Sequence, residues 1–190
     1  MNGGNMKNGF FGTATAMGLF FFAFWAPVAQ SQILTFDFVG LAGGEATANS
    51  NTKDANLATS TISRGAGLTA SANGDRFNAT GWAVSSIANA VSGNDYVEFT
   101  ITPNAGYQFS VSTIAVQWQR SAAGNTAISL RSSANSYATD IDSVKAVTDS
   151  TATQTFTWNV SQANSTAAVT YRLYSYDENV TGTGGPGDGS

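Results

Sequence analysis

In I-A-V-Q-W-Q at residues 114–119, large apolar residues occupy every second position. Side chains alternate between the two faces of a β-strand, so this period of two predicts a strand with Trp118 and two aliphatic residues on one face. Gln117 and Gln119 then lie on the opposite face. Trp118 could instead be an exposed platform that stacks on a sugar, but its apolar neighbours on the same face favour a core position.

The same alternation recurs along the chain, and turn-forming residues such as P-N-A-G at residues 103–106 separate the runs. A sustained helical period is not found after residue 31, although residues 82–91 fit either a short helix or a turn. These features predict an all-β domain over residues 32–180, an antiparallel β-sandwich of jelly-roll type. The alternating runs lie at residues 34–38, 96–102, 107–111, 114–118, 128–131, 156–160 and 169–173.

The two ends of the chain differ from this central part. Lys7, an apolar run over residues 10–26 and the small residues Ala29 and Ser31 are typical of a signal peptide over residues 1–31 that is cleaved before Gln32. The alternative is a single N-terminal membrane anchor, since the run approaches the length of a span. We expect cleavage, and therefore a mature chain without a membrane span. Residues 181–190 are rich in glycine and predict a flexible tail or linker.

Composition excludes several classes of function. The formal net charge of −4 and the scattered basic residues argue against a nucleic-acid partner. The chain has neither cysteine nor histidine. It therefore cannot form a disulfide framework, a Ser-His-Asp triad or the commonest zinc sites. We expect no cofactor.

A series of short motifs resembles exported bacterial proteins and modules of the PEP-CTERM sorting type. The resemblance implies secretion or attachment to a bacterial cell surface and a jelly-roll-like sandwich, and it implies no catalytic residue. Members usually continue beyond the position of Tyr176 into another strand and a hydrophobic anchor, which this sequence lacks, so we expect an unanchored chain with an open sheet edge. The motifs are F-D-F at 36–38, R-G-A-G-L at 64–68, N-D-Y-V-E-F at 94–99, P-N-A-G-Y-Q-F at 103–109, Q-R-S at 119–121, L-R-S-S at 130–133 and Y-R-L-Y at 171–174.

Carboxylates would have to carry any catalysis in a chain without histidine. Asp140 and Asp142 would share one face of a strand. Glycoside hydrolysis needs two such groups on either side of a cleft, but the surrounding sequence contains no motif for it. We expect the two aspartates to be solvated loop residues. The alternative is a weak structural calcium site, because calcium binds clustered oxygen ligands in loops. We expect no enzymatic activity and assign no other metal ligand.

Polar residues that alternate with the apolar runs are the candidate ligand-binding residues. Their amide, guanidinium and phenol groups can exchange hydrogen bonds with a glycan, and pairing of neighbouring strands would gather them into one patch. We therefore expect a secreted or cell-surface binding module for carbohydrate or another extracellular polymer. The alternatives are a structural spacer or self-associating module and, third, a polysaccharide-active enzyme. The candidate residues are Gln117, Gln119, Arg131, Arg172 and Tyr174.

Overall fold

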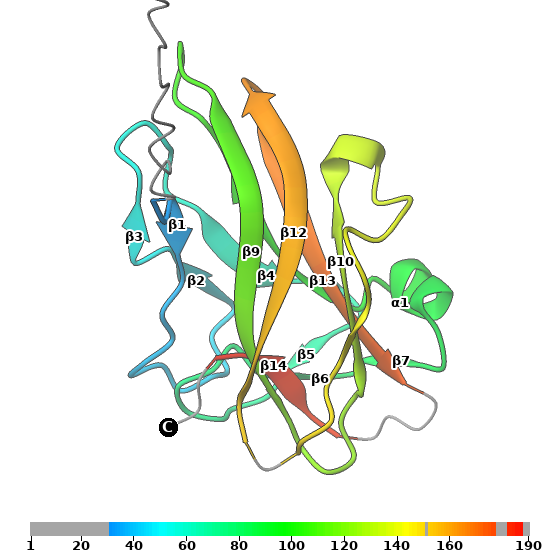
Figure 1. Cartoon of the computed structure of the whole chain (residues 1–190). Coiled ribbons are helices and arrows are strands. Elements are labelled where there is room, and N and C mark those ends of the chain that lie inside the picture. The colour runs from blue at the N-terminus through cyan, green and yellow to red at the C-terminus, as the bar shows by residue number, and fades with distance from the viewer. Residues whose placement is uncertain (1–30, 151, 178–181, 188–190) are drawn as a thin grey trace, which may run out of the picture. The chain divides into compact units, whose positions relative to one another are not determined.

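The computed structural model describes residues 31–150, 152–177 and 182–187, and the predicted signal peptide lies outside them except for Ser31. The described residues form an antiparallel β-sandwich, which confirms the all-β prediction (Figure 1). In the described part of the chain no helix is long and apolar enough to cross a membrane.

Seven strands form the larger sheet, and β7 (Ala83–Val84) is its one parallel member, pairing with the end of β13. The other six follow the order β11 (Lys145–Ala146), β10 (Ala127–Ser132), β13 (Val169–Asp177), β8 (Tyr96–Ile101), β4 (Thr61–Arg64) and β2 (Thr47–Asn49).

Five strands form the second sheet, and a separate antiparallel pair joins β1 (Leu34–Thr35) to β3 (Thr52–Lys53). The order in the five-stranded sheet is β12 (Gln154–Ser165), β9 (Phe109–Arg120), β14 (Gly184–Pro186), β6 (Ala79–Thr80) and β5 (Thr69–Ala70).

One apolar core joins the inner faces of the two large sheets. Trp118 and Trp158 from the five-stranded sheet belong to the same cluster of buried residues as Leu130, Tyr171 and Leu173 from the seven-stranded sheet. Trp118 is 1% exposed and packs edge-on against Trp82 at 5.4 Å between ring centroids. The prediction that Trp118 is a core residue is confirmed.

The region at residues 82–91 contains both a strand and a helix. Trp82 is followed by β7, and then α1 (Ile87–Gly93) begins after Ser86, whose hydroxyl accepts a hydrogen bond from the Asn89 amide at 3.3 Å. The helix packs on the outer side of the seven-stranded sheet, with Ala90 buried against Tyr96 and Tyr174.

The prediction of a flexible tail at residues 181–190 is wrong for residues 184–186. They form β14, which lies between β9 and β6 in the middle of the five-stranded sheet. Gly184 accepts a hydrogen bond from Trp82 Nε1 at 3.1 Å, and a Cβ atom on Gly185 would lie only 2.9 Å from Asn78 Cα. Glycine is therefore needed here because the neighbouring backbone leaves no space for a side chain. A strand also follows Tyr176, contrary to the expectation that it would be missing.

Candidate functional site

The five candidate ligand-binding residues do not form one patch. Gln117 and Gln119 belong to β9, which pairs with β12 and β14. Arg131 belongs to β10, whereas Arg172 and Tyr174 belong to β13, and these two strands pair with each other in the opposite sheet. The outward side chains of the two sheets point to opposite sides of the sandwich. The predicted patch is therefore wrong, because alternation assigns a residue to a face of its strand but does not say which sheet the strand joins.

Arg172 is engaged within the protein on the outer face of the seven-stranded sheet. Its guanidinium carbon lies 3.9 Å from the ring centroid of Tyr96 and 3.9 Å from that of Tyr137, so the cation is held between two aromatic rings. Its Nε donates a hydrogen bond to Glu98 Oε2 at 2.8 Å. Burial lowers the pKa of Arg172, but hydrogen bonds with Tyr174 and Glu98 outweigh burial and raise the pKa overall. Arg172 therefore stays charged.

Arg131 lies opposite Arg172 in the strand register and holds the segment that covers it. The Nε of Arg131 donates to Asp140 Oδ1 at 2.6 Å, and its Nη1 donates to the Tyr137 carbonyl at 3.0 Å. Its charge is thus used to keep Tyr137 in place over Arg172.

Tyr174 is also unavailable to a ligand. It is 1% exposed and packs edge-on against Tyr96 at 5.5 Å under α1. The expectation that Tyr174 adds a stacking surface is therefore wrong, because α1 covers the outer side of β13 at this position. We call this surface the closed face; its residues are Tyr96, Glu98, Arg131, Tyr137, Arg172 and Tyr174.

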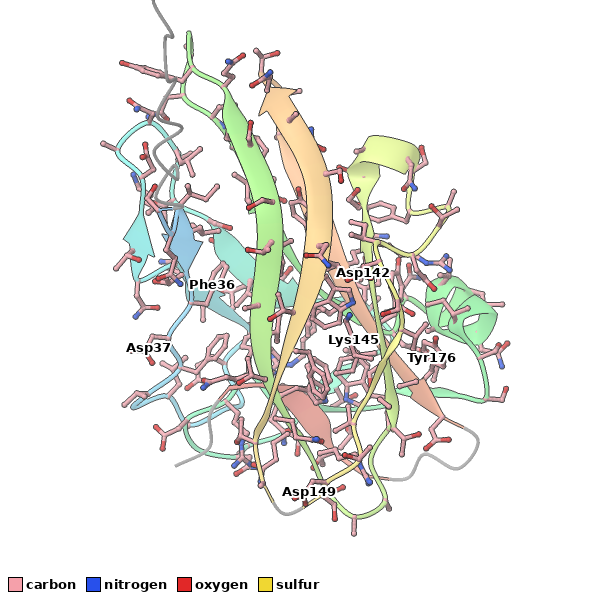
Figure 2. All side chains as sticks on the ribbon, viewed as in Figure 1. Phe36, Asp37, Asp142, Lys145, Asp149 and Tyr176 are labelled. Atoms are coloured by element: carbon pink, nitrogen blue, oxygen red, sulfur yellow. The ribbon has the colours of Figure 1, made fainter. Side chains whose placement is uncertain are left out.

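The two calcium candidates bind separate partners within the protein. Asp140 accepts from Arg131, whereas Asp142 Oδ2 accepts from Lys145 Nζ at 3.3 Å and from the Asn159 amide at 3.1 Å. The Asn159 and Ser143 amides and Lys145 lower the pKa of Asp142. Figure 2 shows Asp142 and Lys145 together beside β12. Among the described residues there is no group of three acidic, cysteine or histidine side chains that could hold a metal ion.

The outer face of β9 and β12 has the opposite character and is open to solvent. Cross-strand neighbours on this face are Thr155 with Gln117, Thr157 with Ala115, and Asn159 with Thr113. All six are exposed, whereas Gln119 further along β9 is half-buried. We call these six residues the open face.

The strands of the open face carry no charge, and the Asp142 carboxylate bonds to Asn159 at one end of this face. Residues 99–119 and 150–171 contain no charged side chain, although they include nearly all of β9 and all of β12. Gln117 was predicted from the sequence as a contact residue, but its five neighbours on the open face were not. The absence of charge over two segments that both alternate with period two was the signal that could have found them.

An exposed aromatic ring lies where β9 begins. The Tyr107 amide donates to the Asn104 carbonyl at 3.0 Å in a turn whose Gly106 has φ +86, as expected from the P-N-A-G sequence. Tyr107 is 51% exposed, and a shallow hollow beside it is lined by Asn104, Gln108 and Thr166. The hollow therefore combines one aromatic ring with amide and hydroxyl groups.

The fold and these surfaces define a β-sandwich with one closed and one open outer face. The chain matches no family model, no curated protein and no solved structure. The chemistry of the two faces therefore indicates what the protein can bind.

Proposed function

We propose that this chain is an exported, non-catalytic binding module of a bacterial cell surface or extracellular matrix. Its ligand is a neutral polysaccharide that lies along the open face, with its length parallel to β9. The observation that carries the proposal is the uncharged, solvent-exposed array of Gln117, Thr155, Thr157 and Asn159 on two paired strands.

The chemistry of the open face suits a neutral sugar polymer. Hydroxyl and amide groups both donate and accept hydrogen bonds, as the hydroxyls of a sugar do. Neighbouring residues on one face of a strand are about 7 Å apart, so the three rows offer contacts over consecutive sugar units. Each neutral hydrogen bond contributes only about 1 kcal/mol net, so affinity depends on several contacts and falls between about 1 mM and 1 μM.

Tyr107 adds the contact that a polar array lacks. Its exposed ring can stack on the apolar face of a sugar, while Asn104 and Gln108 in the same hollow offer hydrogen bonds. The hollow lies just before the start of β9 and is a contact point separate from the open face. The closed face offers no comparable site, because Arg131 and Arg172 are paired there and Tyr174 is buried.

Export is part of the proposal and rests on the sequence. The features of a signal peptide and the resemblance to PEP-CTERM-type proteins both support a location at or beyond the cell surface. A polysaccharide-active enzyme is less well supported, because Asp140 and Asp142 face different partners and do not flank a common cleft.

The proposal is tested by measuring binding of the purified chain to neutral and acidic polysaccharides immobilised on an array. We expect binding to a neutral polymer that changes little between low and high salt, because screening acts on charges. Tyr107→Ala should weaken this binding at least tenfold, and the pair Gln117→Ala with Thr155→Ala should weaken it roughly fivefold to tenfold.

The matched control is the pair Asn49→Ala with Thr61→Ala, another exposed cross-strand pair, located on the seven-stranded sheet. It should leave binding unchanged. Equal losses for the two pairs, preferential binding to acidic polymers, or no binding at all would each refute the proposal.

A further inference from the structure

The longest open edge of the sandwich is β12. This strand has 12 residues, and among the described residues it pairs with β9 alone, so its other side ends the five-stranded sheet. The strands at the other three ends of the two large sheets, β5, β11 and β2, have only two or three residues each. An open edge carries unpaired backbone groups that another strand can bind.

The hydrogen bond of the Asn159 amide shows which backbone amides of β12 point away from β9. Its amide donates to Asp142 and not to β9, so the amides of Thr157 and Thr155, two and four residues earlier, point the same way. The Gln117 carbonyl, opposite Thr155 in the register, accepts from the Gly187 amide on the other side of β9, which agrees with this direction. Register with β9 is continuous from Gln154 to Asn159, and the bulges begin only after Asn159. A regular segment with outward amides therefore remains available.

This edge has little of the protection found on most natural edge strands. Such strands are usually blunted by charged residues, by proline or by bulges. Residues 150–171 contain no charge and no proline. The protection that exists lies at the two ends of the regular segment: the Asp142 carboxylate and the bulges at Asn159 and beyond, and Thr148 and Asp149, which bond to the Gln154 side chain. Phe156 is packed against the core but is only partly buried at this edge. A strand added beside β12 would bury more of the Phe156 ring.

We propose that two copies of this chain associate through antiparallel pairing of β12 with β12, which joins their five-stranded sheets into one. The outward amides set the register: Thr155 of one copy lies opposite Thr157 of the other, and the two Phe156 side chains meet at the two-fold axis. Thr155 and Thr157 each exchange backbone hydrogen bonds with the other copy. The inner-facing Phe156 rings contact each other as a cross-strand pair.

A second copy fits this edge because the edge is its own complement. Two-fold symmetry brings identical residues together, so any charge on the strand would meet a like charge of the other copy. The chain carries a net charge of −4, yet none of it lies on residues 150–171. At each end of the pairing, the oppositely charged Asp142–Lys145 pair of one copy approaches the segment around Asp149 of the other copy, whose backbone amide donates to Gln154 Oε1. Thr, Phe and Trp in this segment also favour strands.

The test is analytical ultracentrifugation of the chain purified after export, together with hydrogen exchange at low and high protein concentration. We expect a dimer, and amides of Thr155 and Thr157 that exchange more slowly as concentration rises. Thr157→Pro removes one outward amide without removing a bond to β9, and it should raise the dimer dissociation constant about tenfold or more. The exchange measurement on the unaltered chain needs no variant to fold.

The control is Thr157→Val, which keeps the amide and the strand preference and should leave dimerisation unchanged. Thr157→Val also removes a hydroxyl from the open face, so this variant can lose sugar binding while it still forms a dimer. The dimer inference therefore does not depend on the proposed function. A chain that stays monomeric, a dimer unaffected by Thr157→Pro, or a dimer in which both amides exchange rapidly would overturn it.

Discussion

The two outer faces of the sandwich use their polar residues in different ways. On the closed face, arginines, acids and tyrosines bind one another, and α1 covers Tyr174. On the open face, the exposed threonine and amide side chains carry no charge, and the Asp142 carboxylate bonds to Asn159 at one end. The comparison teaches that charged and aromatic residues, the usual candidates for ligand contact, serve here to close one surface, whereas the surface left for a partner is neutral.

A substitution in the core between the two faces should change the free energy of unfolding more than any substitution on the faces themselves. Trp118→Ala should lower the free energy of unfolding by about 3–5 kcal/mol, because it removes a large side chain that is 1% exposed. Chemical denaturation measures the change. Gln117→Ala, the neighbouring residue on the open face, is the control and should stay within about 0.5 kcal/mol of the unaltered chain. Similar losses for both would show that the open face is also packed.

Arg172 on the closed face should give an intermediate effect. Arg172→Ala should lower the free energy of unfolding by about 2 kcal/mol, because Glu98 loses its partner and two tyrosine rings lose the cation between them. Arg172→Lys should recover only part of this loss, since an ammonium group cannot stack as a planar guanidinium does. If Arg172→Ala melts as the unaltered chain does, the closed face is not held together by this cluster.

The smallest effect is a pH dependence at the margin of the closed face, where α1 leads into β8. Burial raises the pKa of the Asp95 carboxyl, which is 8% exposed and packs against Gly67 and Gly93. The folded state then holds this proton more strongly than the unfolded state. Stability from this group is therefore greatest below the ordinary aspartate pKa and falls as the pH rises through the raised value.

Asp95→Asn should remove this contribution and raise the melting temperature at neutral pH relative to the unaltered chain. Melting curves at acidic and neutral pH measure the difference between the two proteins. A variant that is equally destabilised at both pH values would show that the carboxylate is stabilised by an interaction and not penalised by burial.

The sequence was sufficient to predict the strands whose side chains alternate. β8, β10, β12 and β13 were all expected from this pattern, and so was the buried position of Trp118. β9 was expected as two separate runs, which the structure joins into one strand. The alternation of apolar and polar side chains could not predict β14, because Gly184 and Gly185 have no side chains. Glycine is required at these positions because neighbouring backbone atoms lie close to them. The pairing of β9 with β12 over a long sequence separation was also invisible, and it decided which candidate residues share a face.

The place of β14 has a consequence for the order in which the molecule can be assembled. In the chain it follows every other strand, yet it lies between β9 and β6 in the sheet. A chain that emerges from its N-terminal end, from a ribosome or through a membrane channel, presents β9 and β6 before the strand that joins them. Until residues 184–186 are released, both strands expose backbone that a neighbouring chain can capture. Delayed folding, by a chaperone or by slow early pairing, would therefore protect this protein while it is being made.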